Sequence, residues 1–342
     1  MAKSLPAQLM PVTAPAPTPG TPVHDVRALM DDVFSKLESS RALVQSSVDL
    51  DISAGENPGR TCRVALKITG GTAAVSMDAS PAFLADFGAV PEFNAEGHHV
   101  IALIMEKDLA EHSPATLAEV NRILAAADRD IREAATFPDD IRNAQPQTKP
   151  FHFVDIPFED GGPVNPKLPD APHVLSALEH FSELLQSKKG SAREKADAVS
   201  WLIHLFGDVH QPLHCIEHRS ELHPEGDRGG NLFKIRGAKR NLHSLWDSSV
   251  NVTQSLDEDQ IADEILQAHP RSSLVKELGV VDPEKWARTS FSLAKTHAYT
   301  LEEDPANPPQ ASMAYKKNME KVGRKQAALA GFRLADRLTA IL

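Results

Sequence analysis

The chain has 342 residues and a formal net charge of -11 at pH 7, which allows one large domain or two ordinary ones. This charge argues against a broad basic surface for nucleic acid, so an anionic substrate would need a local cation such as a bound metal. Two cysteines, Cys62 and Cys215, exclude a disulfide scaffold, and no apolar run is long enough to span a membrane.

The first 92 residues form an extension of unknown role. Residues 1–22 contain six prolines among Ala, Thr and Gln, a composition typical of a disordered tail. Apolar residues at helical spacing predict one amphipathic helix between residues 24 and 45. Residues 60–85 allow two interpretations: a poor match to a secretory signal, or a short strand or hairpin. The second is the simpler.

From Gly97 onward the apolar pattern predicts an all-α domain. Apolar residues recur with the period of a helix in segments 97–109, 117–124, 174–185 and 196–209, and in a last segment from about Ala314 to Leu342. Segments 143–172 and 215–240 are rich in Pro, Gly and charge. We therefore expect long loops in those two places.

The segment WLIHLFGDVHQPLHC, residues 201–215, carries the first chemical signal. His204 and Asp208 stand four residues apart and so share one helix face. Pro212 ends or kinks this helix, and His214 follows in the turn. Imidazole and carboxylate groups that converge in this way are natural ligands for zinc.

A second pair of the same form, His243 and Asp247, lies in NLHSLWDSS. One such pair is expected by chance in many helical proteins, but two pairs with His214 between them are far less so. The alternative is that the histidines are ordinary structural groups and the aspartates are solvated. That alternative does not explain the apolar neighbours of His204 and Asp208, because a carboxylate there needs a partner to stay charged.

Six motifs in order resemble those of the zinc-dependent single-strand nucleases of the S-one/P-one type. They are FNAEGHHVIALI (93–104), TFPDDIR (136–142), FHFVDIP (151–157), WLIHLFGDVHQPLH (201–214), DRGGN (227–231) and NLHSLWD (241–247). The resemblance covers residues 93–342, and the ordered set is specific where single motifs are not. It implies an all-α fold like that of zinc-dependent phospholipase C, with a trinuclear zinc cleft.

The resemblance also implies which groups hold the three zinc ions. Ligands expected for the first zinc are Asp139, His152, His204 and Asp208. Ligands expected for the second zinc are His214, His243 and Asp247. Ligands expected for the third zinc are His98, Asp208 and the backbone of Phe93. The neighbouring His99 and the His210 side chain, which faces another side of its helix, are not expected to be ligands.

The third zinc site departs from the family pattern. The family uses the amino group and carbonyl oxygen of a tryptophan at the mature N-terminus, whereas Phe93 is internal and offers an amide. One alternative is that the chain is cut before Phe93. The other is that the third zinc keeps only the Phe93 carbonyl, His98 and Asp208, and binds more weakly.

Three further residues are expected to contact the substrate. Arg142 matches a family arginine near the phosphate, where a planar guanidinium suits phosphate oxygens, although a surface salt bridge is the alternative. Phe153 and Asp155 are similar to residues that stack on a nucleobase and hydrogen-bond to it, but a core Phe and a turn Asp are equally common. The expected catalytic residues are Asp139, Asp208 and Arg142.

Residues 93–342 are therefore expected to be a zinc-dependent endonuclease domain. Its substrates would be single-stranded DNA or RNA and nucleotides, cut to 5′-phosphate products by a hydroxide that bridges two zinc ions, with 3′-nucleotidase activity left open. The alternatives are a zinc-dependent phospholipase C, whose last ligand pair is His-x-x-x-Glu, and a zinc-bound, catalytically weak binding protein. The resemblance implies a secreted or periplasmic location, but no clean signal peptide is present, so a cytoplasmic location stays open.

Overall fold

The chain divides into two compact units, residues 1–89 and 90–342, in a computed structural model. The structure describes the backbone of three strands in the first unit and most of the second. The described residues are 45–53, 61–69, 72–79 and 95–342, apart from 160, 164, 188 and 238. The expected tail at residues 1–22, the expected helix before residue 45 and Phe93 lie outside the described residues.

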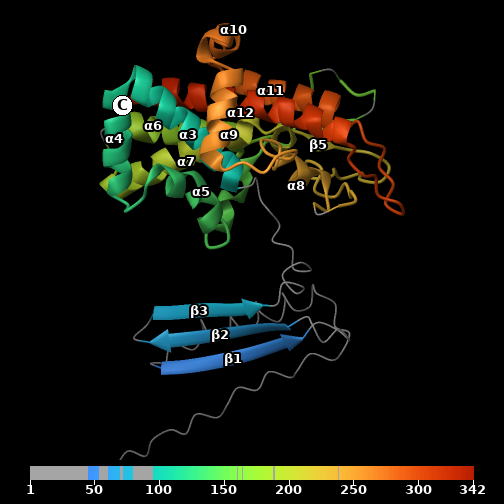
Figure 1. Cartoon of the computed structure of the whole chain (residues 1–342), viewed down its shortest axis with the longest axis horizontal. Helices are drawn as coiled ribbons and strands as arrows, with labels where there is room; N and C mark the ends of the chain where they lie inside the picture. The colour runs from blue at the N-terminus through green and yellow to red at the C-terminus, as the bar shows by residue number, and fades with distance from the viewer. Residues whose placement is uncertain are drawn as a thin grey trace, which may run out of the picture. The chain divides into compact units, whose positions relative to one another are not determined.

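The first unit contains a three-stranded antiparallel sheet (Figure 1). Its strands are β1 (Gln45–Ser53), β2 (Thr61–Thr69) and β3 (Thr72–Ala79), in the order β1-β2-β3. Thr69 pairs with Thr72, so β2 and β3 form a tight hairpin. The structure thus has the strand and hairpin that were one interpretation of residues 60–85.

The second unit is helical, as the sequence predicts. Its main helices are α3 (Ala95–His112), α4 (Pro114–Ala125), α5 (Ile131–Ile141), α6 (Val174–Gln186), α7 (Ala192–His210), α8 (Leu242–Trp246), α9 (Glu258–Ala268), α10 (Val275–Leu278), α11 (Pro283–Leu293) and α12 (Met313–Ile341). Short 3-10 helices η1 (Pro146–His152), η2 (Pro212–Cys215) and η3 (Arg271–Ser273) and a short π-helix η4 (Ala294–Ala298) lie between them. Two short parallel strands are β4 (Pro157–Phe158) and β5 (Glu217–His218). The all-α class is confirmed for this unit.

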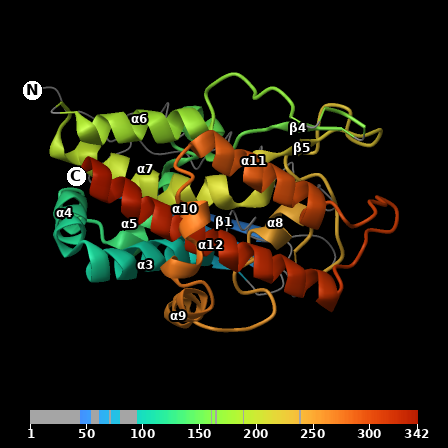
Figure 2. The same cartoon turned by 90° about the horizontal axis from the view of Figure 1, so that it is seen from above.

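Helix α7 lies at the centre of the second unit and packs against α3, α5, α6 and α12 (Figure 2). Every residue from Ala198 to His210 is buried. A helical segment that is enclosed on all sides needs apolar residues all round it, and residues 198–210 are apolar apart from Ser200, His204, Asp208 and His210. Those polar groups are therefore carried into the core of the molecule.

Local sequence signals set the ends of α7. Ser191 caps the first turn and accepts a hydrogen bond from the backbone N–H of Glu194, while the Glu194 carboxylate accepts the N–H of Ser191. The helix ends at His210, two residues before Pro212, as predicted. The chain then turns directly into η2, which places His214 beside the end of α7.

The two predicted loops are mostly irregular in the structure. Among the described residues of 143–172, the regular elements are η1 and β4, and among those of 215–240 there is little more than β5. The two strands pair in parallel, Pro157 with Glu217 and Phe158 with His218. This pairing brings together the segments that follow His152 and His214. Within the described residues, no helix is both long and apolar enough to cross a bilayer.

Candidate metal centre

Six elements and their ends bring eight histidines and aspartates together in the core of the second unit. Helices α3, α5, α7 and α8 and the turns η1 and η2 position all of them. The residues are His98, Asp139, His152, His204, Asp208, His214, His243 and Asp247. Their nitrogen and oxygen atoms fall into three groups in which all ligand atoms lie within 4.8 Å of one another.

The first group lies between η1 and α7. The Nδ1 atom of His152 is 2.9 Å from Nε2 of His204 and 3.1 Å from Oδ2 of Asp208. Asp139, on α5, places Oδ1 3.6 Å from Nε2 of His204. Three of these four residues are buried, and the Asp139 side chain is only 16% exposed. This is the set expected for the first zinc.

The second group joins η2 to the end of α8. The Oδ1 atom of Asp247 is 3.6 Å from Nε2 of His214 and 3.7 Å from Nε2 of His243, and the two imidazole rings stack with centroids 4.9 Å apart. Asp247 is fully buried, and within the described part of the chain its Oδ2 atom has no hydrogen-bond partner. Such an oxygen is costly to bury unless a cation meets it, so this donor set fits a metal ion.

The third group adds His98 from α3. Its ring is fully buried and stacks on the ring of His204 with centroids 3.7 Å apart. Its Nε2 atom is 3.7 Å from Oδ1 of Asp208, and it also groups with Asp139. Asp208 thus turns one oxygen toward the first group and the other toward His98. The remaining expected ligand, Phe93, lies outside the described residues.

Gly207 makes room for His98. A Cβ atom at this position of α7 would lie 2.7 Å from Nδ1 of His98, closer than non-bonded atoms approach. Only a residue without a side chain lets α3 and α7 cross closely enough for the two imidazole rings to stack. Sequence analysis missed this role, although the glycine stands directly before Asp208 in an otherwise apolar helix.

Backbone carbonyls hold several imidazole rings in one orientation. The Nδ1–H of His204 donates to the carbonyl of Ala135 at 2.8 Å, and that of His243 donates to the carbonyl of Gly229 at 2.8 Å. His214 makes a similar bond to a backbone carbonyl. A ring that donates through Nδ1 presents the lone pair of Nε2, which is the tautomer that a metal requires.

Gln211 orients the carboxylate of Asp247. Its side chain is buried, and its Nε2–H donates to Oδ1 of Asp247 at 2.7 Å, while its Oε1 accepts the N–H of Leu213. The amide therefore ties the end of α7 and η2 to the end of α8. Sequence analysis missed this residue, although it lies between the two predicted ligands Asp208 and His214.

The electrostatics of the cluster favour a cation. Burial by itself would lower the pKa of His204, but the Asp208 and Asp139 carboxylates outweigh it and raise the pKa to about 9. Burial is likewise outweighed at His214, where Asp208 and Asp247 raise the pKa to about 10. In the absence of a metal, protons on these two rings balance the carboxylates. A divalent ion can replace those protons.

The expected substrate residues lie around this cluster. Arg142 follows the last turn of α5. Burial lowers the pKa of its guanidinium, and the negative charges of Asp208 and Asp247 oppose that shift. The ring of Phe153 is 37% exposed. Burial, together with the nearby Glu217 and Asp227 carboxylates, raises the pKa of Asp155 to about 7.

Two histidines that were not expected to be ligands have other partners. His210 donates through Nδ1 to the carbonyl of Phe206 at 2.7 Å and accepts the guanidinium of Arg333 at Nε2, also at 2.7 Å. His99 lies 2.8 Å from the carboxylate of Glu258. Neither belongs to the three groups of candidate ligands.

Comparison with known proteins points to one family. The model of the S1/P1 Nuclease family matches residues 93–342. Endonuclease 4 of Arabidopsis thaliana is 28% identical over 172 residues, 45% of this chain and 54% of that protein. Nuclease S1 of Aspergillus oryzae is 28% identical over 164 residues, 45% of this chain and 53% of that protein. Endonuclease 1 of Arabidopsis thaliana is 24% identical over 236 residues, 64% of this chain and 73% of that protein. The match thus spans about half the length of the first two of these relatives.

Proposed function

The chain belongs to the S1/P1 nuclease family, and on that premise we propose that it is a zinc-dependent endonuclease of single-stranded DNA or RNA. The observation that carries this proposal is the convergence of eight histidine and aspartate side chains, from segments spread over residues 98–247, in three adjoining groups. In an acidic chain, bound metal ions at these groups would supply the positive charge that a phosphate needs. The expected products carry a 5′-phosphate.

The donor set fits zinc. Imidazole nitrogen and carboxylate oxygen are the atoms that zinc takes in catalytic sites, and the rings of His204 and His243 are held in the matching tautomer. We propose three zinc ions, with the third held by His98, Asp208 and the backbone of Phe93. Zinc bound in such a site polarises phosphoryl oxygens and lowers the pKa of water.

The protein's own residues orient the substrate beside this cluster. The guanidinium of Arg142 can take two phosphate oxygens at once, and the half-exposed ring of Phe153 can stack on a base. The pKa of Asp155 is raised to about 7. Near neutral pH its carboxyl group can therefore either donate a hydrogen bond to the edge of that base or accept one. A base inside a duplex is already stacked on its neighbours and cannot reach the Phe153 ring. Stacking on this ring therefore favours unpaired strands.

The most direct experiment removes the negative charge of Asp208, the carboxylate that lies between the first and third groups of candidate ligands. The variant Asp208→Asn should lose about three orders of magnitude in cleavage of single-stranded DNA, because the loss of a metal site costs several kcal/mol of transition-state stabilisation. Bound zinc, measured by elemental mass spectrometry, should fall with it. Asp170→Asn is the matched control, since the Asp170 side chain is 95% exposed and distant in sequence from all ligands.

Cleavage should also stop with a chelator and return with zinc. Full activity in Asp208→Asn, or with the metal removed, would contradict the proposal. Parallel assays with phosphatidylcholine distinguish the nuclease from a phospholipase C, and tightly held zinc without turnover on either substrate would indicate a binding protein. The family also favours a secreted or periplasmic protein, which fractionation of cells that produce it would test.

A further inference from the structure

None of the eight candidate metal ligands lies on helix α12, yet this helix contacts both segments that carry the second group of ligands. The end of α7 and the turn η2 lead to His214, while α8 carries His243 and leads to Asp247. Side chains of α12 make hydrogen bonds with both segments. The function proposed above gives this helix no role.

The end of α7 needs hydrogen-bond donors from outside the helix. In a continuous helix the carbonyls of Val209 and His210 would accept the N–H groups four residues later. Here those N–H groups, of Leu213 and His214, bond to Gln211 instead, one to its side chain and one to its carbonyl. Two carbonyls in the buried last turn of α7 are therefore left for other donors.

Helices α11 and α12 supply such donors. The hydroxyl of Ser290 donates to the carbonyl of Val209 at 2.7 Å, and the side-chain N–H of Gln326 donates to the carbonyl of His210 at 3.1 Å. Both side chains are buried, which strengthens these hydrogen bonds and makes their loss costly. Gln326 thus fixes the last residue of α7, four positions before His214.

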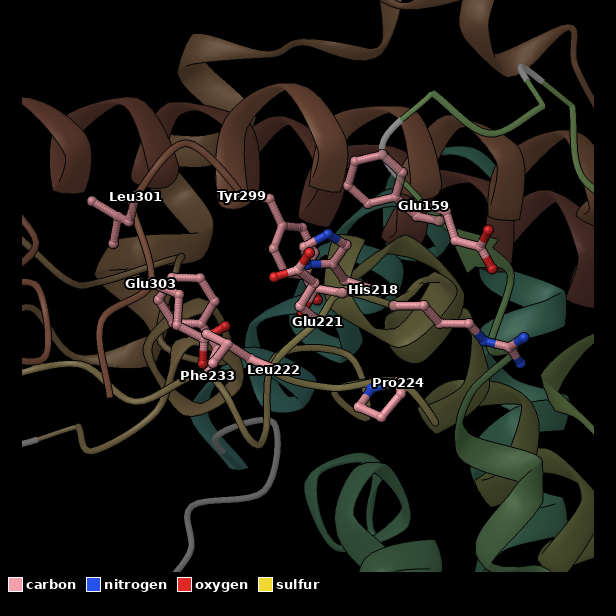
Figure 3. Close-up of a pocket in the computed structure, with 12 residues that line it drawn as sticks. Glu159, His218, Glu221, Leu222, Pro224, Phe233, Tyr299, Leu301 and Glu303 are labelled. Atoms are coloured by element: carbon pink, nitrogen blue, oxygen red, sulfur yellow. The ribbon is translucent and has the colours of Figure 1, made fainter. Parts of the chain in front are cut away.

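A second side chain of α12 fixes α8. The indole N–H of Trp246 donates to the hydroxyl oxygen of Tyr315 at 2.8 Å, and the two rings pack edge to face with centroids 6.4 Å apart. Trp246 is fully buried, is the last residue of α8 and directly precedes Asp247. The Tyr315 hydroxyl in turn donates to the carbonyl of Ala298 at 2.8 Å, beside Tyr299, which lines the cavity shown in Figure 3.

Gln326 and Tyr315 lie on one face of α12. They are eleven residues apart, which is close to three helical turns and about 16 Å along the axis. Met319 and Val322 lie between them on the same face and pack in the hydrophobic core. Because regular backbone hydrogen bonds fix the rise of a helix, α12 holds the two segments at a set separation.

We propose that Gln326 and Tyr315 are positioning residues for the second metal ion. Helix α12 between them is a spacer that sets the separation of His214 from the ligands of α8. The hydrogen bond from Gln211 to Asp247 spans the same gap and requires the same separation. This inference rests on the proposed function, because it needs a metal ion at the second group, and it adds two residues that provide no ligand.

Zinc affinity tests the spacer without any catalysis. Gln326→Met keeps the length of the side chain and removes its N–H donor, and Tyr315→Phe removes only the hydroxyl. Each should raise the dissociation constant of one bound zinc ion about tenfold, the lower end of the effect of residues that orient metal ligands. Competition with a chromophoric chelator measures this constant on the full chain. In an Asp247→Asn background, which disables the second group, neither change should have a further effect.

The double variant distinguishes a spacer from two local effects. Changes at residues this far apart normally add, so two independent tenfold losses would give about a hundredfold loss of affinity. Once one end of a spacer is released, releasing the other end changes little, so the double variant should stay near tenfold. A hundredfold loss in the double variant, or no loss in either single variant, would overturn the inference.

Leu338→Ala is the matched control for stability. Leu338 is fully buried on the same helix, beyond both anchoring residues. Its truncation leaves a cavity, so the Tm should fall at least as far as in Gln326→Met, while zinc affinity should not change. An equal loss of affinity in Leu338→Ala would mean that lower stability alone weakens the site, which would also overturn the inference. If Gln326→Met does not fold, Gln326→Asn takes its place, because it keeps the amide and is too short to reach the carbonyl.

Cleavage of single-stranded DNA separates this inference from the nuclease proposal. Activity of Gln326→Met and Tyr315→Phe should be low when zinc is limiting and recover in excess zinc. Loss of activity with unchanged zinc affinity would contradict a role in metal positioning. If the unmodified chain binds zinc but cuts no nucleic acid, the nuclease proposal fails, while the zinc measurements still decide on the spacer.

Discussion

The orientation of the Asp247 carboxylate depends on the side-chain amide of Gln211. One of its carboxylate oxygens accepts the Gln211 N–H at 2.7 Å, and the other has no hydrogen-bond partner within the described residues. The amide therefore decides which oxygen is left for a cation. Groups that orient a ligand in this way contribute strongly to metal affinity although they never touch the metal.

We expect Gln211→Leu to weaken zinc binding at the second group by about 10 to 100-fold, because the carboxylate loses the hydrogen bond that fixes its rotation. Competition with a chromophoric zinc chelator measures the dissociation constant. Gln186→Leu on the exposed side of α6 is the matched control. Unaltered zinc affinity in Gln211→Leu would show that Asp247 is held by its surroundings alone.

At the scale of elements, the site depends on how closely helices cross α7. The stacked rings of His98 and His204 lie between α3 and α7, and Gly207 leaves space on α7 for the His98 ring. Farther along the same helix, the buried Arg333 of α12 donates to His210 and so links the C-terminal helix to the end of α7. The geometry of the ligands thus depends on helices that contribute no ligand.

Gly207→Ala should displace His98, because the new Cβ atom would lie 2.7 Å from its Nδ1 atom. Overpacking of this kind costs about 1–3 kcal/mol, partly offset by roughly 1 kcal/mol from the better helix propensity of Ala. We expect a net loss of stability in urea unfolding and less than the full zinc content.

Gly279→Ala provides the comparison. This glycine ends α10 with an ordinary backbone angle, and an added Cβ atom would meet nothing closer than 3.5 Å. Its stability and zinc content should stay close to those of the unmodified protein. If Gly207→Ala behaved in the same way as Gly279→Ala, the close approach of α3 and α7 would not be what positions His98.

At the scale of the whole molecule, metal binding and folding are coupled. The candidate ligands come from segments between residues 98 and 247, so a bound ion links most of the helical unit. An ion that binds only the folded state raises its stability. The same core is a source of repulsion among carboxylates when the ion is missing, and the protons on His204 and His214 then relieve it.

This coupling predicts how stability depends on pH. In the metal-free protein the pKa values of His204 and His214 are raised to about 9 and about 10 from an ordinary value near 6.5. Their stabilising contribution is therefore complete below about pH 6.5 and is lost as pH rises through 9 and 10, by up to about 1.4 kcal/mol per pH unit for each ring.

The Tm of the chelator-treated protein should accordingly fall between pH 7 and pH 9, whereas the zinc-loaded protein should show little change because its ligand nitrogens carry no proton to lose. Circular dichroism at a series of pH values, with and without zinc, measures both curves. The pKa values of His98, His152 and His243 are lowered, so these three residues change the stability only at pH values below this range. A metal-free Tm that stays level or rises over this range would contradict the scheme.

Much of the fold and part of the site were predictable because they depend on local spacing. The helical period marks α7 and α12, Pro212 marks the end of α7, and the four-residue spacing of His204 and Asp208 places both on one face. Strands β2 and β3 were less certain, because residues 60–85 fit two patterns, and strand β1 was not predicted. The resemblance added Asp139 and His152, which have no local signal of their own.

Residue types, their spacing and the ends of the helices were determined by the sequence by itself, because each depends on contacts within a few positions of the chain. Only the tertiary structure decided that Gln211 holds Asp247 and that Gly207 admits His98. Those features join segments that are far apart in the chain. Close packing brings such segments together at distances of a few ångströms, and no periodicity in the sequence records that distance.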